Sequence, residues 1–174
     1  MERRTIGVML ADARARLRRL TPIEAATAIG DGWILIDTRD GDVRSRDGTI
    51  PGAIHVPLSV LEWRVDPTSE YPDPVLASSD GRFILVCEHG YSSSLAAVRL
   101  QELGFRLATD VIGGFEAWAA AGLPVTRDAT MTTARTENGS ATIAPSDDAS
   151  ISPRRRTGPK ERERSDEGST SWDR

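Results

Sequence analysis

Short apolar runs alternate along this chain with longer segments whose apolar residues recur every three or four positions. Two runs, residues 33–37 (WILID) and 82–86 (RFILV), are bounded by glycine or turn residues, as is typical of buried strands in a parallel sheet. Residues 109–112 predict another short strand. Because helical segments separate these runs, the pattern predicts an α/β domain with a small, mostly parallel sheet and helices on both faces.

The segments between the predicted strands carry helix signals at their ends. Residues 21–30 begin with the sequence Thr-Pro-Ile-Glu, a capping box with proline at the first helical position. Residues 93–103 carry an apolar stripe and are followed by glycine, and residues 115–121 lie between glycines. Each of these segments is predicted to be a helix.

The two ends of the chain differ from its middle. Apolar residues spaced three or four apart over residues 5–20 predict an amphipathic helix, and we expect residues 1–20 to pack on a domain formed by residues 21–127. A transit peptide is the alternative for this segment, but acidic residues within it argue against one. Residues 128–174 are rich in Thr, Ser, Asp, Pro and Arg, which predicts a disordered polar tail.

Size and charge narrow the classes of function. The 174 residues suit one domain, and 39% hydrophobic with 28% charged residues is the composition of a globular protein. A net charge of −4 provides no general positive field, so we expect neither nucleic acid nor a membrane as a partner. The N-terminal region lacks the apolar core of a signal peptide.

Cysteine and histidine are too few for the common structural sites. The single cysteine, Cys87, cannot form an internal disulfide, which indicates a reducing compartment and favours a cytoplasmic protein. The two histidines, His55 and His89, have no zinc-ligand spacing with it. We therefore expect no metal and no other cofactor.

Cys87 stands where ligands collect in a parallel sheet. It follows the predicted strand 82–86 and precedes the predicted helix 93–103, at the carboxyl end of the strand. Backbone N–H groups of the turn and the positive end of the helix dipole favour an anion there, so we expect its thiol pKa to lie below the ordinary value of about 8.5. The alternative is a buried small apolar residue at a strand end, the commoner fate of a lone cysteine.

The residues after the cysteine suit a loop that binds negative sulfur. Gly90 permits a positive φ or close backbone approach, and Ser92 and Ser93 can cap the helix and donate hydroxyl hydrogen bonds. Such a cradle of N–H groups would stabilise the terminal sulfur of a cysteine persulfide. Tyr91 and His89 would form the rim, and His89 is interpreted as a rim residue because its position gives it no definite proton to move.

Three separated pieces of the sequence resemble rhodanese-like proteins. They are residues 35–39 (LIDTR) with 48–53 (GTIPGA), residues 87–93 (CEHGYSS) and residues 111–118 (VIGGFEAW), and together they cover roughly residues 21–127. The resemblance implies a rhodanese-like α/β domain with single-domain sulfurtransferase activity. It further implies that the cysteine accepts sulfur from thiosulfate or a persulfide donor and releases it to a thiol or to cyanide.

The resemblance also assigns roles to residues. In the family, six residues beginning at the cysteine cradle the persulfide. Cys87 is therefore the predicted catalytic residue, and the predicted binding loop consists of Glu88, His89, Gly90, Tyr91 and Ser92, with Ser93 beside it. Asp37 and Arg39 match an Asp-x-Arg sequence after the first strand, where we interpret the aspartate as mainly structural.

Two departures from the family pattern affect the expected chemistry. Many members carry arginine where this loop has Ser92, and without that cation the attraction for dianionic thiosulfate should weaken. The family's Gly-His-Ile-Pro-Gly-Ala sequence has Thr49 in place of its histidine.

A positive charge near the pocket could come from another arginine, although each candidate is more commonly an ordinary surface residue. The candidates are Arg39 and Arg64, with Arg44 and Arg46 as further options. Trp63, beside Arg64, is predicted to lie in the core at a helix end.

Two other functions remain open. Phosphatases related by fold have a cysteine loop one residue longer, with an arginine that grips phosphate at the position of Ser93. Its absence disfavours phosphoryl transfer. The other alternative is a rhodanese-like module that binds a partner without catalysis, against which the intact loop at Cys87 counts.

Overall fold

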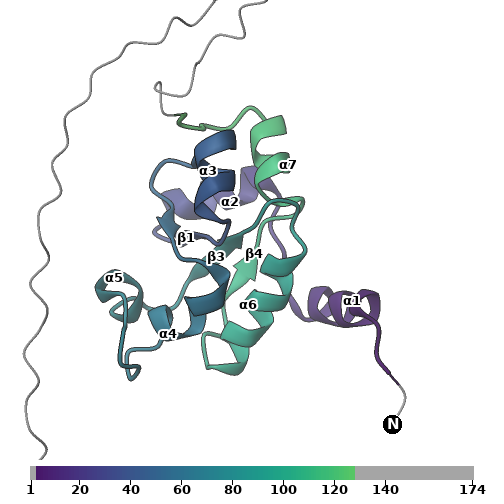
Figure 1. The fold of residues 1–174 in the computed structure, drawn as a ribbon, viewed down its shortest axis with the longest axis vertical. Coiled ribbons are helices and arrows are strands. Elements are labelled where there is room, and N and C mark those ends of the chain that lie inside the picture. The colour runs from purple at the N-terminus through teal and green to yellow at the C-terminus, as the bar shows by residue number, and fades with distance from the viewer. Residues whose placement is uncertain (1–2, 128–174) are drawn as a thin grey trace, which may run out of the picture. The chain divides into compact units, whose positions relative to one another are not determined.

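A four-stranded parallel sheet forms the centre of the computed structural model, which describes residues 3–127. The strands are β1 (Ile34–Asp37), β2 (Ile54–His55), β3 (Phe83–Val86) and β4 (Thr109–Asp110). Their spatial order is β2-β1-β3-β4, so β3 lies in the interior of the sheet between β1 and β4 (Figure 1).

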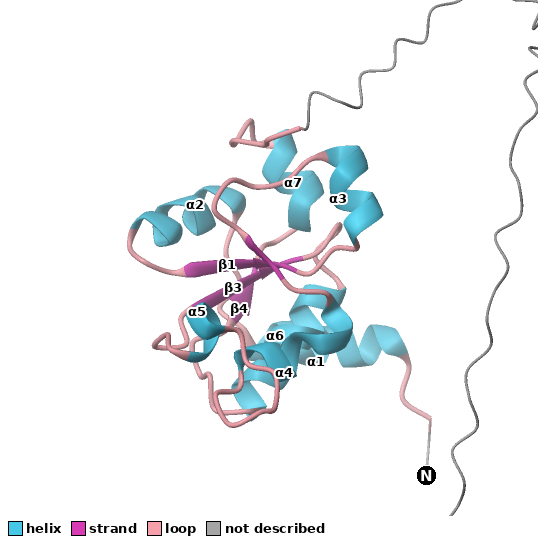
Figure 2. Ribbon diagram, turned by 60° about the vertical axis from the view of Figure 1, so that its left-hand side comes forward, coloured by secondary structure: helices cyan, strands magenta, loops and turns pink. Residues whose placement is uncertain are grey.

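Helices cover both faces of this sheet, as the alternation of apolar runs predicted (Figure 2). One layer contains α2 (Pro22–Gly30), α3 (Gly41–Asp47) and α7 (Gly114–Ala120). The other layer contains α1 (Ile6–Arg16), a 3₁₀ turn (Leu58–Val60), α4 (Leu61–Val65), α5 (Pro74–Ala77) and α6 (Ser92–Glu102). The architecture is therefore a three-layer α/β fold.

The alternation of side chains along β3 explains why this strand reads as a continuous apolar run. Phe83 and Leu85 enter the core beneath α6, whereas Ile84 and Val86 enter the core beneath α2 and α7. Successive side chains of a strand point to opposite faces, and here both faces are covered. All four residues are consequently buried.

The predicted strands and helices are found with small shifts at their ends. β1 and β3 each begin one residue later than the predicted runs 33–37 and 82–86. β4 is shorter than residues 109–112: its last paired residue is Asp110, although the Val111 N–H still donates to the Leu85 carbonyl and Val111 also forms a parallel bridge with Leu20. The capping box at the start of α2 is present in full.

The N-terminal helix is shorter than predicted. It ends at Arg16, and the chain from there to Leu20 is not helical. Ala13 and Leu17 are buried in the core cluster that also contains α6, but Ile6 is 67% exposed. The apolar stripe therefore packs only at its C-terminal half, which brings the arginines of this half next to the sheet edge.

The predicted disordered tail, residues 128–174, lies outside the described residues. Over residues 3–127, the structure contains no helix with the length and apolar character needed to cross a membrane.

Candidate active site

Cys87 directly follows β3, at the carboxyl edge of the sheet. The neighbouring strand β1 ends at Asp37, which pairs in register with Val86, the residue before Cys87. Asp37 and Cys87 therefore lie at the same edge of the sheet. The loop after Cys87 turns into α6, which begins at Ser92. The cysteine is 7% exposed, so its thiol is largely shielded from solvent.

Backbone N–H groups of the loop point at the sulfur. The N–H of Gly90 donates to Sγ at 3.2 Å and the N–H of Ser93 donates at 3.4 Å. The Ser93 hydroxyl oxygen lies 3.2 Å from the same sulfur and accepts the thiol proton when Cys87 is protonated. The loop therefore offers the donors that a negatively charged sulfur requires.

The pKa of the Cys87 thiol is set by two opposing effects. Burial raises it, because removal from water disfavours the thiolate. Hydrogen bonds from the hydroxyls of Ser92 and Ser93, and from the backbone N–H groups of Ser93 and Gly90, lower it. The hydrogen bonds outweigh burial, and the pKa lies below the ordinary thiol value.

The N-terminus of α7 holds the first two peptide groups of the loop. The carbonyl of Cys87 accepts the N–H of Phe115 at 2.8 Å, and the carbonyl of Glu88 accepts the N–H of Glu116 at 3.1 Å. In a planar trans peptide the C=O and N–H point in opposite directions. The N–H groups of Glu88 and His89 are therefore directed away from α7.

Gly90 is held from outside the loop in the same way. Its carbonyl accepts from Arg14 at 2.9 Å and from Arg19 at 3.2 Å, and the Ser94 hydroxyl oxygen lies 3.2 Å from it. Because the Gly90–Tyr91 peptide is trans, the Tyr91 N–H points away from these donors. The two arginines come from the N-terminal segment, which the sequence did not indicate as part of the site.

Two glycines allow the loop and α7 to approach this closely. Gly90 has a φ of +72°, and a Cβ there would lie 2.8 Å from the backbone nitrogen of Gly113. Gly114 has a φ of +64°, and a Cβ there would overlap the carbonyl oxygens of Cys87 and Glu88. Both positions thus require glycine for their backbone conformation and for space.

Asp110 lies behind the loop and was not recognised from the sequence. Its carboxylate is completely buried and accepts the hydroxyls of Ser93 at 3.1 Å and Ser94 at 2.7 Å. Arg19 donates to both of its oxygens, at 2.7 and 2.9 Å. The only signal in the sequence was a charged residue at the end of a buried strand, which called for a partner.

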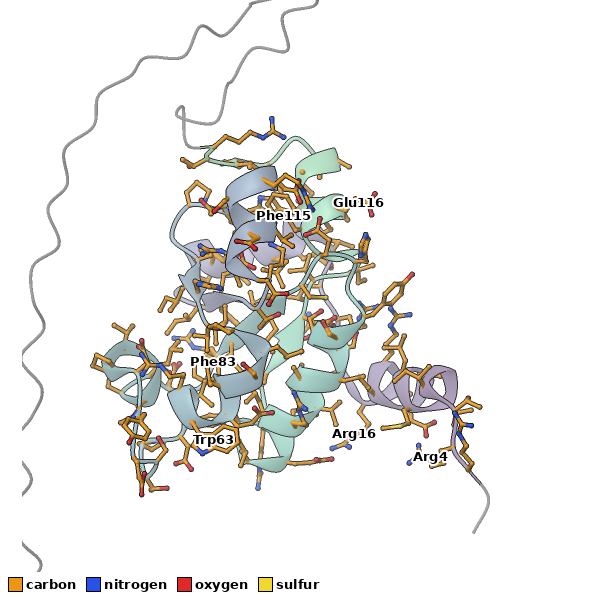
Figure 3. All side chains as sticks on the ribbon, viewed as in Figure 1. Arg4, Arg16, Trp63, Phe83, Phe115 and Glu116 are labelled. Atoms are coloured by element: carbon orange, nitrogen blue, oxygen red, sulfur yellow. The ribbon has the colours of Figure 1, made fainter. Side chains whose placement is uncertain are left out.

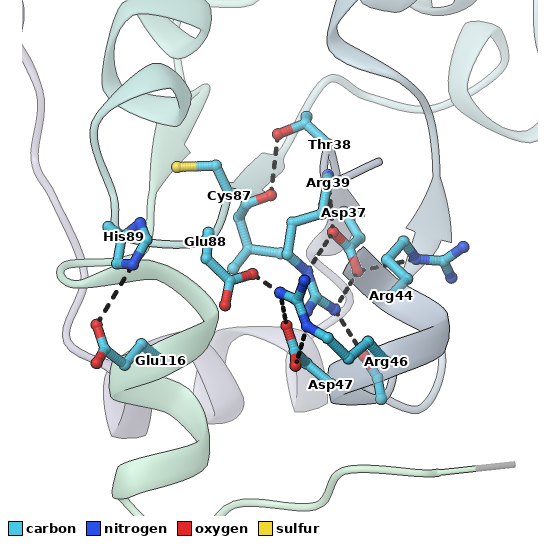
Figure 4. Close-up of polar contacts among 12 residues, drawn as sticks. Asp37, Thr38, Arg39, Arg44, Arg46, Asp47, Cys87, Glu88, His89 and Glu116 are labelled. Carbon is cyan, nitrogen blue, oxygen red and sulfur yellow. Dashed lines mark hydrogen bonds and ion pairs between the residues drawn. The ribbon is translucent and has the colours of Figure 1, made fainter. Parts of the chain in front are cut away.

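His89 and Tyr91 are exposed and lie at the rim of the loop. Their rings stack with centroids 6.3 Å apart, and His89 Nε2 lies 3.8 Å from the carboxylate of Glu116 (Figure 4). Glu116 is itself exposed, on the first turn of α7.

Arg39, a candidate pocket cation, is instead enclosed in a network of contacts (Figure 4). It donates to both oxygens of Asp37, at 3.0 and 2.8 Å, and to the carbonyl of Gly48 at 2.9 Å. Its guanidinium lies 3.5 Å from the ring centroid of Phe115, and its Nη1 lies 3.5 Å from the Glu88 carboxylate. These contacts enclose the guanidinium, whose Nη1 makes no hydrogen bond within the described residues, and make it a brace between β1, α7 and the loop.

Arg64, the other candidate, has its polar contacts within its own part of the chain. It donates to the carbonyl of Tyr71 and pairs with Asp73, and it makes no polar contact with residues 87–93. Trp63 beside it was wrongly predicted to be buried, since its side chain projects from the short helix α4 and is 57% exposed (Figure 3). A helix of five residues offers too little packed surface to bury both faces.

The fold and the loop define a class of protein: a small parallel α/β domain with a cysteine at the carboxyl edge of its sheet, in a loop whose backbone N–H groups point at the sulfur. The family model named Rhodanese-like domain matches residues 21–121. The chain therefore belongs to the rhodanese-like family, as the three sequence pieces had suggested.

Individual relatives agree with this family. Thiosulfate sulfurtransferase GlpE of Haemophilus influenzae is 33% identical over 109 residues, which are 62% of this chain and 93% of the relative. The rice protein named adenylyltransferase and sulfurtransferase MOCS3 (Oryza sativa subsp. japonica) is 34% identical over 94 residues, 52% of this chain but only 21% of that much longer protein.

A solved structure from Rhodopseudomonas palustris is similar over more of the chain. It is 32% identical with a TM-score of 0.65, and the similarity covers 72% of this chain and 97% of that one. That protein is described as one of unknown function and a possible tyrosine phosphatase.

Proposed function

We propose that this protein is a sulfurtransferase that carries sulfane sulfur as a persulfide on Cys87. The named relatives support sulfur transfer in general, because two of them are described as sulfurtransferases. The donor would be thiosulfate or a persulfide, and the acceptor a thiol or cyanide. The observation that carries the proposal is the pair of backbone N–H groups, from Gly90 and Ser93, directed at the Cys87 sulfur.

The proposed reaction has two steps at one sulfur atom. In the first, the Cys87 thiolate attacks the outer sulfur of thiosulfate, an S–S bond forms, and sulfite leaves with the electron pair of the broken bond. The product is the persulfide anion Cys–S–S⁻. In the second, a thiolate or cyanide attacks the terminal sulfur, and the Cys87 thiolate leaves, ready for another turn.

The loop geometry suits the intermediate as well as the resting thiolate. A terminal persulfide sulfur bears the negative charge one atom beyond Sγ, so donors around the loop must reach a second position. Carbonyls of the loop are held from outside by α7, Arg14 and Arg19, which leaves the N–H groups of Glu88, His89 and Tyr91 turned away from those contacts. None of these three N–H groups has an acceptor within residues 3–127, so they are available to an anion.

Intact-protein mass spectrometry tests the proposal directly. Incubation with thiosulfate, followed by removal of the reagent, should add the mass of one sulfur atom, and cyanide or glutathione should remove it. Cys87→Ser should abolish the gain, and Ser79→Ala, which alters a distant hydroxyl, should retain it. Circular dichroism of Cys87→Ser checks that the variant is folded. If thiosulfate, polysulfide and persulfide donors all leave the wild-type mass unchanged, the proposal is wrong and a non-catalytic binding module becomes the better reading.

The phosphatase alternative makes a different prediction for the same cysteine. Its motivation is the solved relative described as a possible tyrosine phosphatase. Against it, the position after the six-residue loop holds Ser93, whose hydroxyl contacts the buried carboxylate of Asp110. An anionic side chain there would oppose a phosphate dianion, and no guanidinium from residues 87–93 can grip it. We therefore expect no hydrolysis of p-nitrophenyl phosphate under conditions in which sulfur transfer is measurable.

A further inference from the structure

The cations around the Cys87 loop differ in whether a carboxylate neutralises them. Arg19 forms a two-pronged pair with the buried Asp110, and Arg39 pairs with Asp37 and Glu88. Arg14 also contacts the loop, but it forms no ion pair with any carboxylate in residues 3–127. Among the described arginines that contact the loop, Arg14 is the one whose positive charge no carboxylate pairs with.

Two contacts hold Arg14 against the loop. One terminal nitrogen donates to the carbonyl of Gly90 at 2.9 Å, and Gly90 is also the residue whose N–H donates to the Cys87 sulfur. The guanidinium carbon lies 5.3 Å from the ring centroid of the exposed Tyr91. Its Nε is buried and has no hydrogen-bond partner within the described residues. The side chain is thus fixed in place by the loop while part of its donor capacity is unused.

The loop itself supplies no permanent positive charge. Residues 87–93 contain one acidic residue, Glu88, and one histidine, His89, and Glu116 adds a further exposed carboxylate at the rim. Glu88 is paired with Arg39, so the exposed carboxylate of Glu116 is the negative group that an anionic reagent would meet at the rim, unless a cation from elsewhere offsets it. Arg14 is in the position to do so.

We propose that Arg14, delivered by α1 from outside the family match, is the specificity-determining cation through which anionic reagents are favoured at Cys87. For a sulfurtransferase this selects negatively charged sulfur donors such as thiosulfate, a conclusion that rests on the function proposed above. Arg19 has a different role. It is paired with Asp110 and donates to the Gly90 carbonyl, which makes it a positioning residue. The N-terminal helix is accordingly a component of the site.

Two alkylating reagents that differ in charge isolate the effect of Arg14. Iodoacetate is an anion and iodoacetamide is neutral, but both are attacked by the Cys87 thiolate, with formation of an S–C bond and loss of iodide. Because Cys87 is the only cysteine, each rate reports one site. A change in thiolate fraction alters both rates equally, so their ratio measures only how the site treats negative charge.

The expected result is a lower iodoacetate-to-iodoacetamide ratio for Arg14→Gln, by roughly threefold to tenfold at low salt, and an intermediate or smaller loss for Arg14→Lys. Arg16→Gln is the matched control, because Arg16 lies on the same helix, is exposed, and pairs with Glu102 away from the loop. It should leave the ratio unchanged. The wild-type ratio should also fall as salt is added, and that of Arg14→Gln should fall less.

Sulfur transfer provides a second, separable measurement. For Arg14→Gln we expect the KM for thiosulfate to rise by a similar factor, with a smaller change in kcat. If Arg14→Gln slows both reagents equally and leaves the ratio of their rates unchanged, Arg14 only shapes the loop and the proposal is overturned. If the glutamine variant is poorly folded, the same comparison of rates is made with Arg14→Lys. If the ratio falls but no donor loads sulfur onto the wild type, the cation role stands and the proposed function fails.

Discussion

Gly114 lies against the carbonyl of Cys87 so closely that no side chain fits between them: a Cβ at Gly114 would overlap that oxygen. The contact exists because the first turn of α7 must come near enough for the Phe115 N–H to reach the same carbonyl, at 2.8 Å. The conformation of the loop at Cys87 therefore depends on a glycine that is far from it in the sequence.

Gly114→Ala should destabilise the protein and displace the loop. A left-handed conformation costs a residue with a Cβ about 1–2 kcal/mol, and the overlap with the Cys87 carbonyl should add roughly 1–3 kcal/mol. Gly122→Ala is the control, since Gly122 also has a positive φ, +71°, but a Cβ there meets nothing within 4 Å. Urea unfolding measures both. Equal losses for the two variants would show that the close approach to the loop carries no energetic weight.

The hydroxyl of Ser93 should help to set the pKa of Cys87. Burial raises this pKa, and the hydroxyl and N–H donors lower it below the ordinary thiol value. Ser93→Ala removes this hydroxyl, so the pKa of Cys87 should be higher in the variant than in the wild type. The measurement is the iodoacetamide rate against pH, whose inflection should lie below about 8.5 in the wild type and higher in the variant. Ser94→Ala should shift it less, because Ser94 contacts Gly90 and Asp110 but not the sulfur.

The same pKa links stability to pH, and the sign follows from its direction. A thiol whose pKa is lowered by folding stabilises the native state above the unfolded pKa, and this contribution is lost as pH falls through the folded pKa. The wild type should therefore gain stability relative to Cys87→Ala as pH rises toward about 9. Urea unfolding at several pH values tests this, and a difference that shrinks with rising pH would contradict the thiolate cradle.

Breaking the Arg19–Asp110 pair should be costly. Asp110 is fully buried and Arg19 retains little exposure, so Asp110→Asn would leave a largely desolvated guanidinium without its partner. We expect a loss of about 2–4 kcal/mol, below the figure for a fully buried pair. Glu102→Gln, which breaks the exposed pair with Arg16, should cost less than about 1 kcal/mol. Similar losses for both variants in urea unfolding would mean that the buried pair is not a structural anchor.

The parts of the fold that could be predicted from the sequence are those that leave a pattern within one short stretch of residues. The strands around Leu35 and Ile84 were predictable because burial on both faces leaves a continuous apolar run. The position of Cys87 at a strand end followed from the same run. The two-residue strand β2 was not predicted, since it is too short to carry a periodic pattern.

The supports of the loop could not be predicted because they join distant parts of the chain. Arg14 and Gly90 are 76 positions apart, and Arg19 and Asp110 are 91 apart. In the sequence, Arg14 and Arg19 were indistinguishable from the other arginines on the polar face of an amphipathic helix. Arg14 lies in the last turns of α1, and Arg19 lies in the non-helical segment that follows its early end at Arg16, so no single helical face places these two side chains together.

Arg39 should prove to be structural, and replacement by lysine should show it. One ammonium group cannot reproduce the two bonds to Asp37, the bond to Gly48 and the contact with the Phe115 ring. Arg39→Lys should lose about 2–3 kcal/mol in urea unfolding although the charge is kept. Arg46→Lys, in the exposed pair with Asp47, should leave the free energy of unfolding nearly unchanged. Normal stability of Arg39→Lys, with a raised KM for thiosulfate, would instead make Arg39 a cation of the pocket.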